Sequence, residues 1–147
     1  MTLQNKHILI TAGPTIEPID PVRFISNHSS GKQGYAIAEA CVKAGAKVTL
    51  VSGPVEIGAP EGVTLVSVTT ADDMLLACES ALPADVAICV AAVCDWKPFK
   101  IYDHKLKKRD GHNTLSLELT KNPDVLAMLS THLDRPKLVI GLSLIHI

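Results

Sequence analysis

The sequence predicts an α/β fold of the doubly wound, Rossmann-like type, with a mainly parallel sheet and helices on both faces. Short apolar runs with the length of strands alternate with stretches of helical apolar periodicity. The first such unit is a strand, a helix and a strand, and this crossover normally joins parallel neighbours. A later run, Asp85–Ala91, is apolar almost throughout, as in strands that are buried on both faces.

The first unit begins with the apolar run His7–Thr11, which the turn residues Ala12, Gly13 and Pro14 terminate. After a long loop, apolar residues recur at helical spacing from Tyr35 to Ala44, and Gly45 ends that helix. The next strand is predicted for 47–52, KVTLVS. These three elements are the best-defined part of the predicted fold.

The remaining elements follow the same alternation. A strand is predicted for 64–68, a helix for 71–81 and the buried strand for 85–91. Residues 114–119 alternate apolar and polar side chains, 122–132 have a helical pattern, and 137–141 resemble another buried strand. Asn122 and Pro123 have the residue types expected for the cap and the first position of that last helix. No repeat, linker or low-complexity tract interrupts the pattern.

Composition excludes several classes of function. The chain has 147 residues, of which 47% are hydrophobic and 20% charged, which fits one globular domain or part of a larger one. A net charge of −1 and 3% aromatic residues argue against a nucleic-acid partner. No apolar run approaches the ~18 to 20 residues of a membrane span, and no signal-peptide core is evident, so we expect a cytoplasmic protein without a membrane partner.

Cysteine and histidine spacing predicts no protein-built metal site. Cys41, Cys78, Cys89 and Cys94 show no CxxC spacing, and the histidines show no HxxxH or HExxH spacing. Cys41 and Cys78 lie within apolar helical patterns, where cysteine behaves as a small hydrophobe. Cys89 and Cys94 flank a segment that follows a predicted strand, but no partner histidine is evident, so neither is predicted as a nucleophile.

Ligands of such sheets bind outside the carboxyl ends of the strands, near the switch point of the strand order. Three loops leave predicted carboxyl ends: residues 13–30, residues 91–108 and the residues after Gly141. The first two loops contain most of the polar side chains that could bind a ligand. They are therefore the candidate site.

The first loop ends in Ser29-Ser30-Gly31-Lys32-Gln33-Gly34, which differs from two known phosphate-binding loops. Ser26 and Gln33 break the Walker A pattern, and Ser29 replaces the first glycine of GxGxxG. Small residues at a helix start still expose backbone N–H groups and the positive end of the helix dipole, which suits an anion. The alternative is that Ser29 or Ser30 only caps the helix.

Asn27 is the candidate catalytic residue of the same loop. Its amide side chain can donate to an oxyanion and accept from an attacking nucleophile without changing protonation. Pro14, Pro18 and Pro21 restrict the loop that presents it. The alternative is that Asn27 fixes a turn.

The second loop combines small residues with lysines. Ala91 and Ala92 allow a flat ring or a sugar to approach the backbone, and Asp95 could hold hydroxyl groups. The lysines of HKLKK, which are Lys105, Lys107 and Lys108, could bind a triphosphate or could form a solvated face. Trp96 could cover the site or pack elsewhere.

The ordered segments ITAGPTIEPIDPVRFISNHSSGKQGYAIAEA, VTLVSGPV, AAVCDW, KLKK and KNPDVL resemble the bacterial phosphopantothenate–cysteine ligases. The resemblance extends over residues 6–141. It implies a ligase that uses CTP to activate the carboxylate of 4′-phosphopantothenate as an acyl-cytidylate. Attack by L-cysteine then gives phosphopantothenoylcysteine, a step of coenzyme A biosynthesis, with Mg²⁺ entering on the CTP.

The resemblance also implies roles for individual residues. Asn27 matches the asparagine that turns over the acyl-cytidylate, and Lys105 matches the first lysine of the KxKK motif. The positions around the phosphopantothenate phosphate correspond to Gly13, Ser29, Ser30, Gly31 and Gly34. The nucleotide contacts correspond to Cys89, Val90, Ala91, Ala92, Asp95, Lys105, Pro123, Asp124, Val125 and Leu126. No residue is implied as a metal ligand.

The resemblance ends at Gly141, and the tail 142–147, LSLIHI, resembles a translated sequencing adapter. We therefore expect residues 1–141 to be a partial ligase domain, a sheet that is incomplete at the C-terminus, and weak or absent turnover. The family implies a homodimer and a fused or separate phosphopantothenoylcysteine decarboxylase, with FMN relevant only to that domain. On the residues alone, a noncatalytic nucleotide-binding module and an NAD(P)-dependent oxidoreductase remain alternatives, although the broken GxGxxG disfavours the latter.

Overall fold

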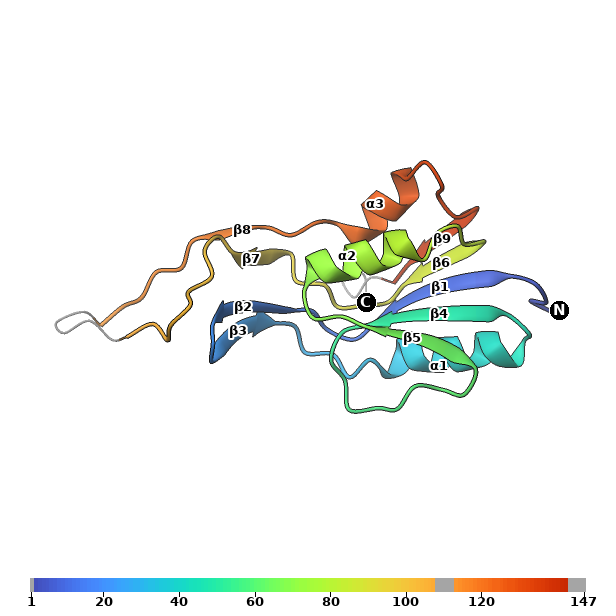
Figure 1. The fold of residues 1–147 in the computed structure, drawn as a ribbon, viewed down its shortest axis with the longest axis horizontal. Coiled ribbons are helices and arrows are strands. Elements are labelled where there is room, and N and C mark those ends of the chain that lie inside the picture. Colours follow the sequence, from blue (N-terminus) through green and yellow to red (C-terminus); the bar gives the residue numbers. More distant parts are fainter. Residues whose placement is uncertain (1, 108–112, 143–147) are drawn as a thin grey trace.

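The computed structural model describes residues 2–107 and 113–142, and its centre is a five-stranded sheet in the order β5-β4-β1-β6-β9 (Figure 1). All four neighbouring pairs are parallel. The bounds of these strands are β1 (His7–Ala12), β4 (Lys47–Ser52), β5 (Val63–Ser67), β6 (Val86–Cys89) and β9 (Leu138–Gly141). The chain therefore has the predicted parallel α/β sheet.

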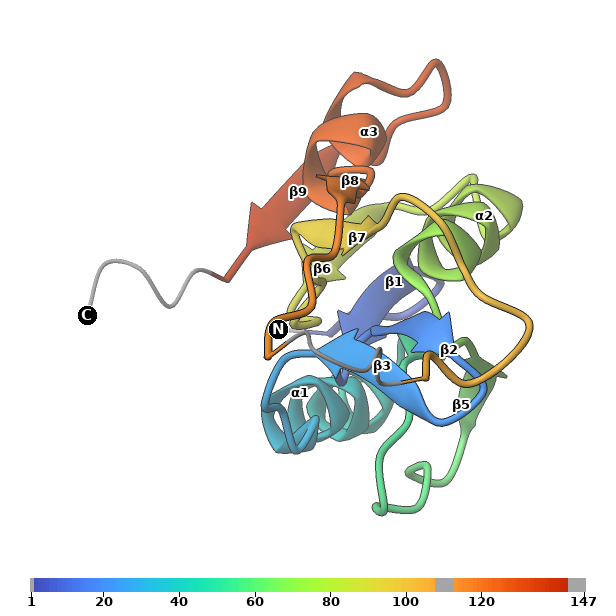
Figure 2. The same ribbon diagram turned by 90° about the vertical axis from the view of Figure 1, so that its left-hand side faces the viewer.

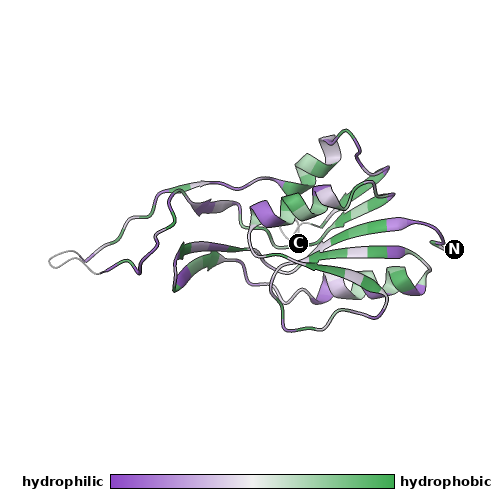
Figure 3. Ribbon diagram, viewed as in Figure 1, coloured by the Kyte–Doolittle hydropathy of each residue, from purple (hydrophilic) through white to green (hydrophobic). Residues whose placement is uncertain are grey.

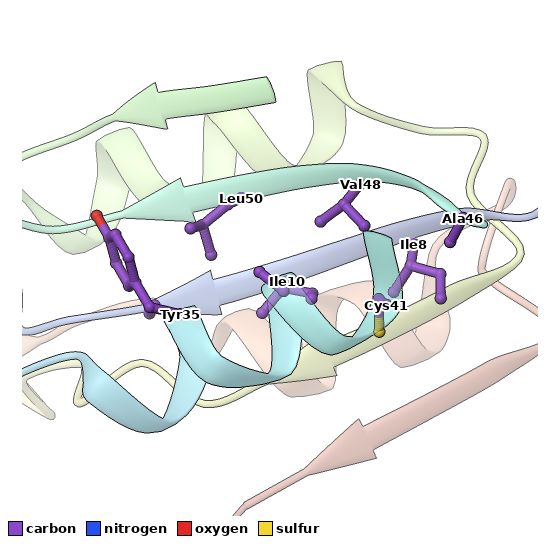
Figure 4. Close-up of a cluster of buried hydrophobic side chains, with 9 residues drawn as sticks. Ile8, Ile10, Tyr35, Cys41, Ala46, Val48 and Leu50 are labelled. Atoms are coloured by element: carbon purple, nitrogen blue, oxygen red, sulfur yellow. The ribbon is translucent and has the colours of Figure 1, made fainter. Parts of the chain in front are cut away.

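Helices cover both faces of the sheet, which confirms the predicted fold class (Figures 1 and 2). Helix α1 (Lys32–Lys43) lies on one face, whereas α2 (Ala71–Ser80) and α3 (Val125–Thr131) lie on the other. Successive side chains of β1 point to opposite faces, so Ile8 and Ile10 pack with α1 and Leu9 packs with α2 and α3. Figure 4 shows the α1 side of this core, where Tyr35 extends toward the end of β4 near Leu50 and Cys41 lies beside Ile8.

The helices begin and end where local chemistry permits. Gly31 precedes α1 with a φ of 72°, a left-handed conformation that favours glycine. Thr70 and Asp73 form a capping box at the start of α2, in which each side chain accepts from the other residue's backbone N–H. As predicted, Gly45 follows α1 with a positive φ.

Two antiparallel hairpins project beyond the carboxyl ends of the sheet strands (Figures 1 and 2). One pairs β2 (Ile16–Asp20) with β3 (Arg23–Ser26), and the other pairs β7 (Trp96–Pro98) with β8 (Leu119–Lys121). A long excursion between β7 and β8, called the arm below, comprises residues 99–107 and 113–118 of the described chain. Figure 3 shows hydrophobic and hydrophilic residues mixed along these projections.

Several predicted boundaries were wrong. The helix predicted for 122–132 begins at Val125 with Asp124 as its cap, because the Asp124 carboxylate accepts from the Ala127 N–H. Of the alternating stretch 114–119, only Leu119 is in a strand, and both hairpins lie where loops were predicted. Lys108 and residues 143–147 lie outside the described residues, so the prediction for the 142–147 tail stays a prediction. Within the described part, no helix is long and apolar enough to cross a membrane.

Candidate active site

The switch point of the sheet lies between β1 and β6. From β1 the chain continues to β4 and β5 on one side, and it later adds β6 and β9 on the other. The loops that follow β1 and β6 therefore leave the sheet in different directions and open a crevice, as expected for this class of sheet. The structure has a cleft of about 1230 Å³ at this position.

The cleft brings together the predicted phosphopantothenate and nucleotide segments. Three stretches form its wall: the start of α1 with the residues before it, the loop after β6, and the start of α3. Among its lining residues are the predicted site residues Gly13, Asn27, Ser29, Ser30, Gly31, Gly34, Cys89, Val90, Ala91, Ala92, Asp95, Pro123, Asp124, Val125 and Leu126. Lys105 is the one predicted site residue that does not line this cleft.

The start of α1 forms one wall of the cleft. No side chain caps this helix, so the alternative that a serine caps it was wrong. Instead, the Ser29 Oγ accepts from the Gly31 N–H at 3.3 Å, and the Ser30 Oγ lies 3.5 Å from the Lys32 N. Helix geometry then leaves the N–H groups of Gln33 and Gly34 without acceptors inside the helix, at its positive end.

Gly34 brings this helix start close to the sheet. A Cβ built on Gly34 would lie 2.5 Å from the Cβ of Ala12, so a larger residue requires the helix to move. Ala12 is the last residue of β1 and is fully buried. The close approach places the free N–H groups of α1 directly at the carboxyl end of the central strand.

Asn27 joins the two loops of the cleft. Its Nδ2 donates to the backbone oxygens of Val93, at 3.1 Å, and Ala92, at 3.4 Å. Both partner atoms are carbonyl oxygens, which can only accept, so the amide atom that bonds to them must be the nitrogen. The bonds reach more than sixty residues along the chain, so Asn27 does more than fix a local turn. The free atom of the amide is Oδ1, an acceptor at the wall of the cleft.

The loop after β6 is held in place by side chains that the sequence analysis did not assign to the site. The Thr11 Oγ1 accepts from the N–H groups of Val90 and Ala91, and the Thr15 Oγ1 accepts from that of Cys94 at 3.0 Å. The Asn122 Nδ2 donates to the Cys94 oxygen at 2.9 Å. Thr11 and Thr15 flank the predicted turn Ala12-Gly13-Pro14. Their position beside this turn could have indicated them as residues of the site.

These bonds determine which backbone N–H groups of the loop remain available to a ligand. The N–H groups of Val90, Ala91, Ala92 and Cys94 are all engaged within the protein. Free N–H groups come instead from α3, where helix geometry leaves those of Val125 and Leu126 without intrahelical acceptors. Exposed Asp95 and half-exposed Trp96 complete this part of the wall.

The cysteines of the site are protonated thiols at neutral pH. Burial raises the pKa of the Cys89 thiol to about 11, and burial also raises the pKa of Cys94. Thiolate is the nucleophilic form, so the structure agrees with the prediction that neither residue is a nucleophile. Among residues 2–107 and 113–142, no group of three His, Cys, Asp or Glu side chains could hold a metal ion.

Lys105 lies on the arm, away from the cleft. The neighbouring Leu106 contacts the turn of the β2–β3 hairpin through Asp20 and Arg23. Asn27 lies four residues after Arg23, directly past the end of β3, a path of roughly 13 Å in extended chain. Lys105 is therefore on a segment that is fastened to the hairpin turn, and it does not line the cleft.

Comparison with known proteins identifies the family. The family model described as "DNA/pantothenate metabolism flavoprotein C-terminal domain" matches residues 3–145. The chain belongs to this family. The fold agrees with this assignment, because the crystal structure of the C-terminal domain of a coenzyme A biosynthesis bifunctional protein CoaBC superimposes with a TM-score of 0.77. That structure is 47% identical, and the match covers 92% of this chain and 63% of that chain.

Relatives of the chain carry the same name in distant bacteria. The CoaBC protein of Vibrio parahaemolyticus is 46% identical over 140 residues, which is 95% of this chain and 35% of the relative. That of Bacillus subtilis is 50% identical over 129 residues, which is 86% of this chain and 31% of the relative. The chain thus spans about a third of the length of the relatives it matches.

Proposed function

We propose that this chain provides the site of a phosphopantothenate–cysteine ligase, acting in cytoplasmic coenzyme A biosynthesis. The observation that carries the proposal is the single cleft at the switch point, which joins the anion-binding start of α1, Asn27 and the loop after β6. These are the segments through which the chain resembles that family. The family membership and the similarity to CoaBC proteins support the same reaction.

In this proposal the start of α1 binds the phosphate of 4′-phosphopantothenate. The N–H groups of Gln33 and Gly34 point their dipoles at the anion, and the serine hydroxyls add donors. Lys32 lines the same wall and adds a cationic side chain. The acyl end of the substrate then extends toward Asn27.

The nucleotide occupies the other half of the cleft. Asp95 suits ribose hydroxyls, and the free N–H groups of Val125 and Leu126 suit phosphate or base oxygens. The substrate carboxylate attacks the α-phosphorus of CTP, and pyrophosphate leaves with the bonding electrons of the broken phosphoanhydride. Mg²⁺ bound to the triphosphate would neutralise part of its charge.

Asn27 serves the second step, in which the cysteine amine attacks the acyl carbon and CMP leaves. Its Nδ2 is committed to the carbonyls of Ala92 and Val93, so its Oδ1 is free to accept from the incoming amine. The residue thereby orients the nucleophile and holds the nucleotide loop beside the helix start. This revises the role in which an Asn27 N–H stabilises an oxyanion.

A second copy of the chain is the proposed partner. Large apolar side chains are exposed on the hairpins and the arm, and these are Val22, Phe24, Phe99, Ile101 and Leu115. Large apolar side chains exposed in such numbers suit an interface. Lys105 lies outside the cleft of its own chain, so a homodimer would allow it to serve the cleft of the other copy. A phosphopantothenoylcysteine decarboxylase, fused or separate, is the further partner that the CoaBC relatives suggest.

The proposal is tested by separating the two chemical steps. Purified protein is given CTP, Mg²⁺ and 4′-phosphopantothenate with and without cysteine, and pyrophosphate, acyl-cytidylate and product are quantified. In Asn27→Asp the carboxylate opposes two carbonyl oxygens and cannot donate to them. We expect product formation to fall by about 10² to 10³-fold, with acyl-cytidylate accumulating because activation is less affected.

Asn5→Asp is the matched control, because Asn5 is exposed, lies outside the cleft and has a φ of 61° that aspartate also tolerates. This variant should keep wild-type turnover. Trp96, the only tryptophan, lines the cleft and reports CTP binding by its fluorescence. CTP binding without any acyl-cytidylate or product in the wild type would favour a noncatalytic nucleotide-binding module, and equal loss of both steps in Asn27→Asp would contradict the role given to Asn27.

A further inference from the structure

The arm that carries the lysine motif is fastened to the β2–β3 hairpin at Leu106. The Leu106 N–H donates to the Asp20 Oδ2 at 3.0 Å, and the Leu106 oxygen accepts from the Arg23 Nη2 at 2.9 Å. Farther up the arm, the Tyr102 N–H donates to the Ile19 oxygen at 3.0 Å. Both backbone polar groups of Leu106 are thus held by side chains more than eighty residues away in sequence.

Asp20 is the fixed point of this contact. Its side chain is fully buried, and its Oδ1 accepts from the N–H groups of Val22 and Arg23, each at 2.9 Å. Its Oδ2 accepts from the Arg23 Nε at 2.9 Å and also pairs with the Arg23 Nη2. A carboxylate that accepts this many bonds has no freedom to rotate. The Arg23 guanidinium holds the pKa of Asp20 well below its usual range, so the group is charged at neutral pH.

The contact acts on the peptide that joins Lys105 to Leu106. The Leu106 N–H belongs to that peptide, so its bond to Asp20 fixes the plane next to the Lys105 Cα. Lys105 itself is exposed. Its backbone is therefore held while its side chain remains free to meet a ligand.

We propose that Asp20 is a positioning residue for Lys105, acting through Leu106. The inference rests on the proposed function insofar as Lys105 binds the triphosphate. Ordering this part of the arm before the nucleotide arrives removes a reorganisation that binding would otherwise have to include. Asp20 touches no substrate in this role. It sets where the lysine is presented, to the cleft of either copy of the chain.

The first test measures the contact without any activity. Asp20→Asn keeps the shape of the side chain but removes the charge that draws in Leu106 and Arg23. Hydrogen exchange of the Leu106 amide, followed by NMR in the full chain, should become about tenfold faster or more, as expected for losing a hydrogen bond to a charged acceptor. Asp85→Asn is the matched control, because Asp85 accepts from the His7 N–H at 2.9 Å and pairs with Lys6. That variant should leave Leu106 unchanged.

The second test asks whether the effect passes through Lys105. We expect Asp20→Asn to raise the KM for CTP about tenfold, with the KM for 4′-phosphopantothenate and for cysteine unchanged. Lys105→Ala should raise the KM for CTP as well, and adding Asp20→Asn to it should have no further effect. A merely structural aspartate would impair all substrates and would add to Lys105→Ala.

Unchanged Leu106 exchange in Asp20→Asn, or additive effects of the two substitutions on the KM for CTP, would overturn the proposal. If the wild type neither binds CTP, as reported by Trp96 fluorescence, nor shows CTP-dependent chemistry, the proposed function fails, while the hydrogen-exchange result still decides whether Asp20 fastens the arm. The two failures are therefore distinguishable.

Discussion

Single residues of the site act largely through backbone groups of other loops. Asn27, Thr11 and Thr15 each bind main-chain atoms of the loop after β6. The sequence indicated Asn27 because an amide in a loop near a helix start suits acyl chemistry. It could not indicate which atom of the amide is free, because that depends on two carbonyls that lie more than sixty residues away. Thr11 and Thr15 were missed for the same reason.

Cys89 shows how burial decides the chemistry of a residue that lines the cleft. Burial raises the pKa of this thiol from 9.0 to about 11, so well below pH 9 the thiolate fraction is on the order of a hundredfold smaller than in the unfolded chain. We expect iodoacetamide at pH 8 to alkylate Cys89 about a hundredfold more slowly in the folded protein than in urea. Peptide mass spectrometry over time measures both rates.

The same shift has a consequence for stability. A raised pKa in the folded state favours the protonated thiol, so this contribution to folding is fully present below pH 9 and is lost as the pH rises toward 11. Rapid labelling of folded Cys89 at pH 8, at the rate of the urea-unfolded chain, would contradict the assignment of a buried, protonated thiol.

At the scale of elements, the sequence predicted the strands and helices that have a regular apolar periodicity. It missed the short strands whose formation depends on pairing with distant residues of the same chain. β1, α1 and β4 were predicted well because each has a regular apolar face that is buried in one core. The two hairpins were missed because β2 contains Pro18 and has a register shift next to it, and because β7 and β8 have three residues each. Strands this short carry little alternation, and their pairing depends on residues far along the chain.

The start of α1 makes a testable prediction at this scale. Gly34→Ala places a Cβ 2.5 Å from that of Ala12, so the first turn of α1 must move away from β1. We expect a loss of about 1 to 3 kcal/mol in unfolding free energy, as for other overpacked sites. We also expect weaker binding of 4′-phosphopantothenate, because the free N–H groups move with the helix. Urea unfolding and calorimetric titration measure the two effects.

Gly58→Ala is the matched control, because a Cβ on Gly58 meets nothing within 4 Å. That variant should keep both stability and affinity. Tight substrate binding by Gly34→Ala with an unchanged unfolding midpoint would show that the close approach of α1 to β1 does not shape the site.

For the whole molecule, the sheet and the projections have different roles. The sheet encloses two cores, one on each face, and creates the cleft at its carboxyl edge. The projections expose large apolar side chains, including Phe99 at 67% and Leu115 at 63%. Sequence reasoning placed the site at the carboxyl ends of the strands, but it could not place the exposed apolar residues, because their exposure depends on hairpins that it did not predict. The apolar projections fit the proposed homodimer.

The last prediction uses this dimer to ask which copy supplies Lys105. The arm is fastened at Asp20 and Arg23, and Lys105 does not line the cleft of its own chain, so we expect Lys105 to serve the cleft of the other copy. Asn27→Asp and Lys105→Ala proteins should each be weak alone. Mixing them after mild dissociation should restore up to about a quarter of wild-type activity, because half of the dimers are mixed and each mixed dimer has one cleft with both native residues. Light scattering confirms the dimers, and the same mixture of Asn27→Asp with Asn27→Asp is the control. If each chain instead used its own Lys105, every cleft in the mixed dimer would lack one residue and mixing would restore nothing.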